Sequence, residues 1–481
     1  MIKIKNYING KLSVSLNKEY IDVFNPSIGK VYAQCPNSNL KDLDNAIKGS
    51  EIAFKKWSNL SQKNRSGFLF KIADLIENNL NEFAEAESID NGKPYELSKS
   101  LDIPRSIKNL RFFASMANNL DNESYHKENI VSHILRQPIG IVGTISPWNL
   151  PLYLFTWKIA PALVSGNCVI AKPSEITPYT AYLFSKMCIK AKLPNGVLSI
   201  LHGDGQIIGE EIVNHKKIKA ISFTGGTDTG KKIAKKAATS LKKISLEMGG
   251  KNPVIIFDDC NYGKMIDSLL KSSFLNQGQI CLAGSRVYVQ ETIYKKFKKD
   301  FISKVQNLKI GDPFNPDTDQ GAIVSNTHLN KILKYIDKAK EEGGIILTGG
   351  IIPKINKKCS SGWFVTPTVI ENIPENSVVN QEEIFGPVVT LNTFKNEKQA
   401  IELANNSDYG LASIIWTNDM KRADKLAELI ESGLVWINCW LERDLRTPFG
   451  GIKNSGFGKE GGKYALDFFT EPKNICTKYY D

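Results

Sequence analysis

The chain has 481 residues, of which 42% are apolar and 23% are charged, and its formal net charge is +12. This length exceeds what one hydrophobic core usually organises, so we expect at least two domains. No apolar run approaches the roughly 20 residues that span a bilayer, and the N-terminus lacks the apolar core of a signal peptide. The eight cysteines form no C-x-x-C pair. These features favour a cytoplasmic protein without a membrane anchor or a metal site.

The positive charge is spread along helical patterns instead of forming a basic stripe with interleaved aromatic residues, so we expect a solvated surface and no nucleic-acid partner. A positive field would still steer anionic substrates toward the protein. The lysines that contribute most visibly are Lys231, Lys232, Lys235, Lys236, Lys242 and Lys243.

The N-terminal part of the chain reads as short strands and turns over residues 1–40, followed by a long helical region from near Leu40 to about Asn119. Apolar residues recur there at helical spacing, and the turn residues Asp90–Pro94 interrupt the pattern. Residues 121–138 are polar and then strand-like, and they look detachable from the domain around them.

Strands and helices alternate after residue 139, which predicts an α/β fold with a parallel, doubly wound sheet and ligand sites beyond the carboxyl ends of the strands. A helix is predicted at Trp157–Ser165. The predicted strands are Gly140–Ile145, Cys168–Ala171, Ile218–Phe223, Lys243–Leu246 and Pro253–Phe257.

The ends of the first three strands carry polar residues suited to ligands. Asn149 offers an amide donor in an irregular, proline-flanked loop, and Thr224–Gly230 is a glycine turn that opens a helix, the arrangement that receives a phosphate. Lys172 and Glu175 follow the strand between them. A carboxylate there accepts both hydroxyls of an adenosine ribose and repels a 2′-phosphate, which predicts NAD instead of NADP.

Cys281 lies in a polar, glycine-loosened segment, F-L-N-Q-G-Q-I-C, where its sulfur can face a cleft as a nucleophile. Glu247 ends an apolar run at two glycines, and burial there would raise its pKa toward that of a general base. None of the five histidines is near either residue in the sequence, so a Cys–His protease has little support. Buried, inert cysteines are expected at Cys35, Cys168, Cys188 and Cys476.

The segments P-W-N, K-P-S-E, F-T-G-x-x-x-x-G, L-E-M-G-G-K, G-Q-I-C, E-E-I-F-G-P and P-F-G-G-x-K-x-S-G-x-G occur in one order from about residue 20 to the C-terminus. As a set they resemble the NAD(P)-dependent aldehyde dehydrogenase superfamily. The resemblance implies a Rossmann-type cofactor domain, an α/β catalytic domain and a small β oligomerisation extension.

The resemblance also implies a mechanism. Cys281 attacks the aldehyde, and the Asn149 amide and the Cys281 backbone N–H hold the resulting oxyanion. Hydride then passes to the nicotinamide, which leaves a thioester on Cys281. Glu247 activates the water that hydrolyses this thioester. The residues that the resemblance assigns to the cofactor are Trp148, Lys172, Ser174, Glu175, Gly225, Gly226, Gly230, Glu383 and Phe385. Gly226 replaces a usual serine, which predicts one lost pyrophosphate contact, whereas Asp228 and Lys459 replace residues of the same charge.

Arg105 and Arg443 fall where the family usually lines its substrate tunnel with apolar or aromatic residues. Two guanidiniums suit a substrate with a carboxylate far from the aldehyde. The surrounding D-I-P-R and R-D-L-R-T-P-F-G-G resemble the subgroup that oxidises 2-hydroxymuconic and 2-aminomuconic semialdehydes. Further candidate substrate-binding residues, expected to wall in the conjugated chain, are Tyr153, Trp157, Trp440 and Phe449.

Several alternatives stay open at this point. Either arginine can instead face solvent or pair with Asp102 or Asp444. Succinic semialdehyde also carries a carboxylate, a broad-range aldehyde dehydrogenase is a further option, and betaine aldehyde is disfavoured by the two positive charges. A catalytically silent binding or structural protein would be signalled by loss of Cys281, Asn149 or Glu247, and all three are present.

The resemblance divides the chain into a cofactor domain, a catalytic domain and an oligomerisation extension. The cofactor domain comprises residues 1–120 and 139–249, with 455–466 returning to it, and the catalytic domain comprises 250–454. Residues 121–138 and 467–481 supply strands that pair with a partner subunit, so we expect a homodimer or homotetramer.

Overall fold

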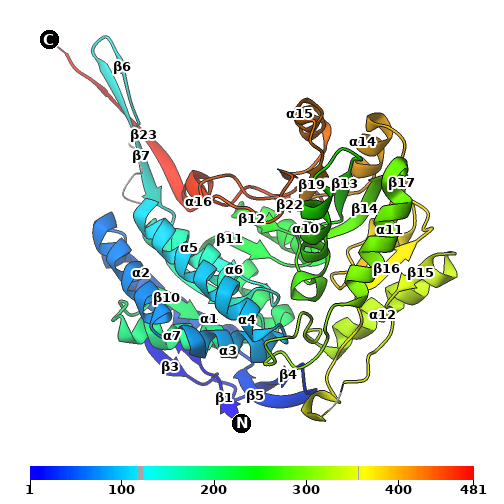
Figure 1. Cartoon of the computed structure of the whole chain (residues 1–481). Coiled ribbons are helices and arrows are strands. Elements are labelled where there is room, and N and C mark those ends of the chain that lie inside the picture. The colour runs from blue at the N-terminus through cyan, green and yellow to red at the C-terminus, as the bar shows by residue number, and fades with distance from the viewer. Residues whose placement is uncertain (117–122, 356, 481) are drawn as a thin grey trace.

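The computed structural model describes residues 1–116, 123–355 and 357–480. Two open sheets, each with helices on both faces, form the two halves of the molecule, and a narrow ribbon of strands projects from one half (Figure 1). This is the α/β, doubly wound architecture with a small β extension that we predicted from the sequence.

The first sheet has a parallel centre and antiparallel outer strands. The chain runs outward from β8 to β9 and β10 on one side and returns to β11 and β12 on the other, so a topological switch point, where such sheets bind ligands, lies between β8 and β11. In spatial order the strands are β22 (Gly456–Phe457), β12 (Lys243–Glu247), β11 (Ile218–Thr224), β8 (Ile141–Ile145), β9 (Cys168–Lys172), β10 (Leu198–Ile200), β2 (Asn6–Ile8) and β3 (Lys11–Ser13).

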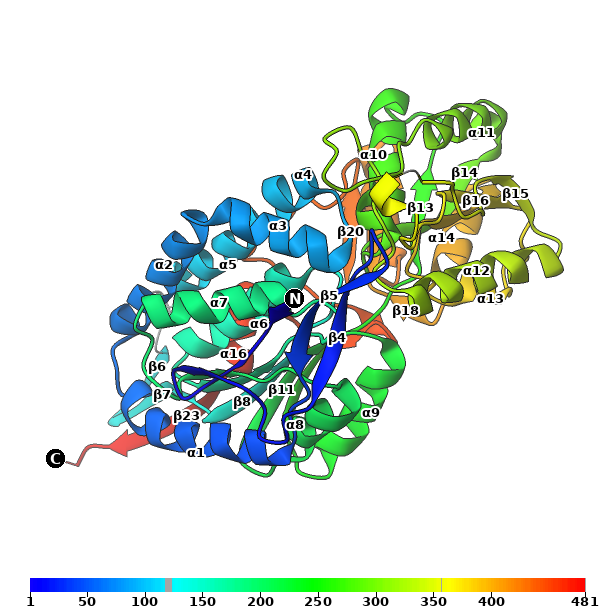
Figure 2. The same ribbon diagram turned by 90° about the horizontal axis from the view of Figure 1, so that it is seen from below.

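Helices cover both faces of this sheet (Figure 2). One face carries α6 (Pro151–Val164) and α7 (Tyr179–Lys190), and the other carries α1 (Leu40–Trp57), α8 (Glu210–Asn214) and α9 (Thr227–Ala238). An outer layer over α6 and α7 consists of α2 (Gln62–Glu77), α3 (Leu80–Asn91) and α5 (Ile103–Met116). The connections include α4 (Tyr95–Leu97) and two π-helical turns, η1 (Ser98–Asp102) and η3 (Gly205–Gly209), a geometry frequent at functional sites.

The start of α6 was wrong in the sequence-based prediction, because the helix begins at Pro151 and not at Trp157. Every residue of α6 is buried, so no amphipathic period marks where it starts. Pro151 occupies a first-turn position, where its missing N–H costs no hydrogen bond. The helical region expected from Leu40 divides into α1, α2, α3 and α5, and its predicted end near Asn119 lies outside the described residues.

The second sheet is parallel except at one edge, where β15 runs antiparallel to β16. In spatial order its strands are β15 (Ile345–Thr348), β16 (Thr368–Glu371), β17 (Val388–Phe394), β14 (Gly284–Gln290), β13 (Asn252–Ile256), β19 (Ala412–Trp416) and β20 (Leu434–Ile437). The last of the five predicted strands, now β13, therefore lies in this sheet, because residues 248–251 carry the chain across from β12.

The helices of the second half also lie on two faces. One face packs on α10 (Tyr262–Phe274) and α11 (Glu291–Gln306), and the other on α14 (Glu397–Asn405) and α15 (Met420–Leu429). The remaining helical segments are α12 (Asn326–Glu341), α13 (Val378–Gln381), η4 (Leu275–Gly278) and η5 (Lys357–Cys359).

The projecting ribbon joins two distant parts of the chain. The strand β23 (Thr470–Lys478), which starts earlier than the tail predicted from residue 474, pairs along β7 (Ile130–Pro138), and β7 pairs with β6 (Glu123–Lys127) (Figure 1). Residues 121, 122 and 481 of the predicted extension lie outside the described residues.

In the part of the chain that is described, no helix is long and apolar enough to cross a bilayer. The remaining elements are β1 (Ile2–Lys3), β4 (Tyr20–Asn25), β5 (Lys30–Pro36), β18 (Tyr409–Gly410), β21 (Ile452–Lys453) and α16 (Gly462–Phe468).

Candidate active site

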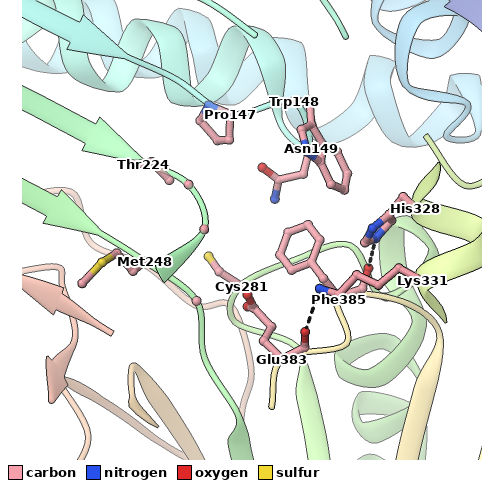
Figure 3. Close-up of a pocket in the computed structure, with 13 residues that line it drawn as sticks. Pro147, Trp148, Asn149, Thr224, Met248, Cys281, His328, Lys331, Glu383 and Phe385 are labelled. Atoms are coloured by element: carbon pink, nitrogen blue, oxygen red, sulfur yellow. Dashed lines mark hydrogen bonds between the residues drawn. The ribbon is translucent and has the colours of Figure 1, made fainter. Parts of the chain in front are cut away.

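The predicted nucleophile Cys281 lies between two cavities where the two halves of the molecule meet. We call the first the Trp148 cavity, and the Cys281 sulfur and the Asn149 amide face the same space in it (Figure 3). We call the second the Arg443 cavity, and Glu247 lines it together with Cys281. The full lining of the Trp148 cavity is Pro147, Trp148, Asn149, Thr224, Gly225, Gly226, Met248, Gly249, Cys281, His328, Lys331, Glu383 and Phe385.

The loop before Cys281 is held in a conformation that few residues adopt. Asn276, Gln277 and Gly278 have φ angles of 53°, 56° and 67°, all in the left-handed region. A Cβ atom at Gly278 would collide with the carbonyl oxygen of Gly386, so this position requires glycine. The polar segment that the sequence indicated is thus a tight turn that presents the thiol to both cavities.

The environment of Cys281 favours the neutral thiol over the thiolate. Burial raises the pKa of the thiol to about 12, and the carboxylates of Glu383 and Glu247 add to the rise, whereas Arg443 opposes it. The sulfur must therefore lose its proton as it attacks a carbonyl carbon.

Asn149 is buried, and its loop is fixed by hydrogen bonds from two other segments. Its Nδ2 donates to the Gln279 carbonyl at 2.9 Å, and the amide carries a second N–H that can serve a ligand. Its backbone carbonyl accepts from Lys93 Nζ at 3.0 Å, Asn276 Nδ2 at 3.1 Å and Asn91 Nδ2 at 3.4 Å. The amide donor predicted from the sequence is therefore held rigidly beside the cysteine loop.

Glu247 ends β12 as a buried carboxyl, and neither of its oxygens has a hydrogen-bond partner among the described residues. Burial raises the pKa of this carboxyl well above its usual value, and Glu460 adds to the rise, whereas Lys158, Lys459 and Arg443 oppose it. A carboxyl with a raised pKa in a cavity is a candidate general base.

Glu460 is a further carboxylate in the Arg443 cavity that the sequence analysis did not identify. Its Oε1 accepts from Lys158 Nζ at 2.8 Å and from Ser222 Oγ at 3.0 Å. Its sequence signal is similar to that of Glu247, because two glycines follow each carboxylate: Gly461 and Gly462 come directly after Glu460, and Gly249 and Gly250 come after Met248.

The glycine turn begins α9, as predicted, with Gly226 at the N-cap. A Cβ atom at Gly226 would meet nothing within 4 Å, so this residue faces open space, whereas a Cβ at Gly230 would collide with Met248. Gly225 and Gly226 line the Trp148 cavity, and Thr229 lines a third space, the Glu175 cavity.

The Glu175 cavity lies beyond the ends of β9 and β11 and combines three carboxylates, Glu175, Asp204 and Glu210, with an apolar wall of Val213, Phe223 and Ile233. Lys172 Nζ donates to Glu175 Oε2 at 2.6 Å. Ser174 is buried, and its Oγ accepts from the Ile176 N–H at 3.2 Å, so it stabilises the turn. The Glu175 cavity and the Trp148 cavity lie on either side of the glycine turn. They fit the adenosine end and the nicotinamide end of a dinucleotide, respectively.

Trp148, Phe385 and Glu383 form the wall opposite the glycine turn (Figure 3). The rings of Trp148 and Phe385 meet edge to face, with centroids 5.2 Å apart. Glu383 Oε1 accepts from the Gly250 N–H at 2.9 Å, and burial raises the pKa of this carboxyl to about 7.

His328 of α12, which is distant from Cys281 in the sequence, lines the Trp148 cavity with it. Its Nε2 lies 2.7 Å from the Phe385 carbonyl oxygen, and burial lowers the pKa of the imidazole to about 4. Lys331, one turn later, donates to the Glu383 carbonyl at 3.1 Å. No local motif marks either residue, so only the packing of α12 places them here.

Both candidate substrate arginines line the Arg443 cavity. The central carbon of the Arg443 guanidinium lies 4.1 Å from the centre of the Trp157 ring and 4.0 Å from the centre of the Phe449 ring, and the group donates to the Tyr153 hydroxyl. The Arg105 guanidinium lies 5.8 Å from the centre of the Tyr153 ring.

Neither arginine pairs with the neighbouring acid that was considered as a partner. Asp102 accepts from Lys93 Nζ at 2.6 Å, and Asp444 pairs with Arg446. Within residues 1–116, 123–355 and 357–480, no carboxylate lies within salt-bridge distance of Arg105 or Arg443.

Two of the predicted wall residues are not part of the cavity surface. Trp157 is buried behind Arg443, and Trp440 donates its indole N–H to the Leu282 carbonyl at 3.0 Å. Of the residues that the structure describes, Tyr153 and Phe449 line the Arg443 cavity, but Trp157 and Trp440 do not. No group of three His, Cys, Asp or Glu side chains in the described chain is placed to hold a metal ion.

Comparison with known proteins agrees with this arrangement over the whole chain. It is 45% identical to human 2-aminomuconic semialdehyde dehydrogenase, with 100% of this chain and 99% of the relative covered. It is 40% identical to 2-hydroxymuconic semialdehyde dehydrogenase of a Pseudomonas strain, covering 99% of this chain and 100% of the relative.

The fold is also that of solved enzymes. Betaine aldehyde dehydrogenase from Staphylococcus aureus, solved in complex with NAD+, superposes with a TM-score of 0.96 at 38% identity, covering 99% of this chain and 95% of that one. The model of the aldehyde dehydrogenase family matches residues 14–475. By this match and by its relatives, and with Cys281 between the cavities of the Asn149 amide and the Glu247 carboxyl, the chain belongs to the aldehyde dehydrogenase family.

Proposed function

We propose that this protein oxidises a semialdehyde bearing a distant carboxylate, such as 2-hydroxymuconic or 2-aminomuconic semialdehyde, to the dicarboxylate with NAD. The observation that carries the proposal is the pair of arginines, Arg105 and Arg443, in the cavity that ends at Cys281 and Glu247. Cationic side chains in an enclosed space need an anionic partner, and the protein supplies none to either arginine among the described residues. The names of the relatives in man and in Pseudomonas support the same substrate class.

The site residues support a covalent route. Cys281 Sγ bonds to the aldehyde carbon as the thiol proton leaves, and Glu247, in the same cavity, is an available acceptor. The oxyanion accepts hydrogen bonds from the Asn149 amide and from the Cys281 backbone N–H. After its first proton has passed to solvent and the bound carbon has lost its hydride, Glu247 takes a proton from the water that attacks the thioester carbon. That proton returns to the sulfur as the acid leaves, which restores the thiol.

NAD is the proposed cofactor, and when bound it supplies the hydride acceptor. Glu175, with Lys172 as its ion-pair partner, would accept the ribose hydroxyls and repel a 2′-phosphate. Ser174 stabilises that turn, and Gly226, where a Cβ atom would meet nothing within 4 Å, leaves room for the pyrophosphate, whereas Gly225 packs on Phe223 and Gly230 on Met248. Trp148, Phe385 and Glu383 would bound the nicotinamide end. The NAD+ complex of the Staphylococcus aureus relative agrees with this cofactor.

The experiment that tests the substrate class compares kcat/KM for a muconic semialdehyde, succinic semialdehyde, betaine aldehyde and a neutral aldehyde of similar length. We expect the carboxylated aldehydes to be preferred and betaine aldehyde to be poor. Arg105→Met should lower kcat/KM for the carboxylated aldehydes about tenfold or more, because a hydrogen bond to a charged group contributes about 1.5–3 kcal/mol.

Equal efficiency for all four aldehydes in the wild-type enzyme would indicate a broad-range dehydrogenase, and the substrate proposal would be wrong. A strong preference for succinic semialdehyde over the longer chain would reassign the substrate within the same class. No NAD reduction with any of them would favour the catalytically silent alternative.

We further propose a homodimer or homotetramer that is located in the cytoplasm and assembles through the ribbon of β6, β7 and β23. The exposed ribbon supports an interface, because unpaired strand edges need covering. We keep the proposed domain limits of 1–120, 139–249 and 455–466 for the cofactor domain and 250–454 for the catalytic domain. Sedimentation velocity of the full chain would decide between a monomer, a dimer and a tetramer.

A further inference from the structure

Tyr153 contacts both arginines of the Arg443 cavity. It lies in the first turns of α6 and is 5% exposed. Its hydroxyl accepts a hydrogen bond from Arg443 Nη1, and its ring lies beside the guanidinium of Arg105, with 5.8 Å from the guanidinium carbon to the ring centre. One side chain therefore touches the two cations that the proposed function assigns to the substrate carboxylate.

The Arg443 guanidinium is fixed in orientation by three contacts. The central carbon of the group lies 4.1 Å from the centre of the Trp157 ring and 4.0 Å from the centre of the Phe449 ring, which favours the cation at this place. These two contacts alone leave the group free to rotate. The hydrogen bond to Tyr153 lies at the edge of the guanidinium and fixes this rotation.

The rotation matters because the other end of the guanidinium is left without a partner. Arg443 Nη2 is buried and has no hydrogen-bond acceptor among the described residues. A buried donor without a partner is costly, and an arginine cannot lose its charge to avoid that cost. Nη2 is therefore an unsatisfied donor until an anion or a water molecule arrives.

Tyr153 is itself held by the helix that carries Arg105. Asn109 Nδ2 of α5 donates to the Tyr153 carbonyl at 3.0 Å, and Asn109 is fully buried. The spacing between Tyr153 and Arg105 is thus fixed by contact between α5 and α6, not by a flexible loop.

We propose that Tyr153 is a specificity-positioning residue: its hydroxyl turns Arg443 so that Nη2 faces the cavity, and its ring supports Arg105, so that both cations meet one carboxylate. This inference rests on the proposed function. It differs from the expectation that Tyr153 only walls in the substrate chain, because a wall needs the ring and not the hydroxyl.

The test is Tyr153→Phe, which keeps the ring and removes the hydroxyl. We expect the ratio of kcat/KM for a muconic semialdehyde to kcat/KM for a neutral aldehyde of similar length to fall about tenfold, mainly through KM of the carboxylated aldehyde. Tyr182→Phe, at a half-buried tyrosine of α7 that does not line the Arg443 cavity, controls for loss of a tyrosine hydroxyl and should leave the ratio unchanged.

A second measurement covers a variant that is inactive or poorly folded. Binding of the dicarboxylate product to the Tyr153→Phe protein by calorimetry should weaken about tenfold while the thermal midpoint stays close to that of the wild type.

The outcomes separate the two proposals. If the wild-type enzyme shows no preference for the carboxylated aldehyde, the proposed function is wrong and this inference falls with it. If the wild type shows the preference and Tyr153→Phe keeps it, the inference alone is wrong. A loss of efficiency that is equal for both aldehydes would make Tyr153 a structural residue and would also overturn the inference.

Discussion

At the scale of single residues, the Glu247 carboxyl is controlled by the charges around it. Burial and Glu460 raise its pKa, and Lys158 opposes them, so the group is held protonated to higher pH than an exposed glutamate. A base must be deprotonated to accept a proton, so the rate of thioester hydrolysis should rise with pH until Glu247 is ionised.

The variant Glu460→Gln should move the acidic limb of the kcat profile to lower pH. The change removes a negative charge that disfavours ionised Glu247 and leaves Lys158 Nζ, which lay 2.8 Å from Glu460, without its counterion. Both effects favour the Glu247 carboxylate. The measurement is kcat between pH 5 and 10, with the exposed Glu428→Gln as control. If the acidic limb of the kcat profile stays in place or moves to higher pH, Glu460 does not raise the pKa of Glu247.

At the scale of elements, the turn after α3 holds the loop that follows β8. Lys93, with no exposed surface, is 2.6 Å from Asp102 and 3.5 Å from Glu87, and it donates to the Asn149 carbonyl at 3.0 Å. Asn91, the last residue of α3, donates to the Trp148 carbonyl at 3.1 Å. The turn thus connects η1, the π-helical segment before Arg105, to the loop that holds Asn149 beside Cys281.

The variant Lys93→Met should destabilise this half of the molecule and lower kcat. Removing the cation leaves two carboxylates buried without their partner, which costs about 3–5 kcal/mol. The measurement is the urea midpoint of the whole protein, followed by tryptophan fluorescence, together with kcat. Lys99→Met removes an exposed lysine from η1 and is the matched control. Equal midpoints for the two variants would show that Lys93 does not stabilise the turn.

At the scale of the whole molecule, catalysis depends on the junction of the two sheets. Asn149 and Glu247 come from the ends of β8 and β12 in the first sheet, whereas Cys281 comes from the loop before β14 in the second. Any opening of the junction separates the nucleophile from its partners, so global stability and activity are linked.

Acid should weaken the global fold through His202. This histidine has no exposed surface, and burial, followed by the nearby Lys172, lowers the pKa of its imidazole from 6.5 to about 3. Between these pH values the unfolded chain binds a proton that the native chain does not. The stability that His202 contributes above pH 6.5 is therefore lost as the pH falls toward 3, and the loss at pH 5 is about 2 kcal/mol.

The measurement is the urea midpoint at pH 7 and pH 5 for the wild type and His202→Leu. The variant cannot bind the proton, so its midpoint should fall less between the two pH values. His126→Leu, at an exposed histidine of β6, serves as control. A fall of the same size in all three proteins would mean that His202 does not contribute to the acid sensitivity.

Local patterns were sufficient for much of the site. Asn149, Glu247 and the Gly225–Gly230 turn follow strands that are visible as apolar runs, and parallel strands bring their carboxyl ends to one edge. Cys281 was identified because a glycine and polar residues interrupt an apolar pattern just before it. Each of these sequence signals lies within a few residues of the functional residue that it predicts, so the sequence alone is enough to recognise it.

The partners of those residues were decided only by tertiary packing. His328 and Lys331 reach the cavity because α12 packs beside residues 383–385, and Lys158 meets Glu460 across a separation of 302 residues. Asp102 pairs with Lys93 instead of Arg105, and Tyr153 meets Arg443 from another element. A side chain's partner depends on which distant surfaces pack together, and neither hydrophobic period nor local motif encodes that choice.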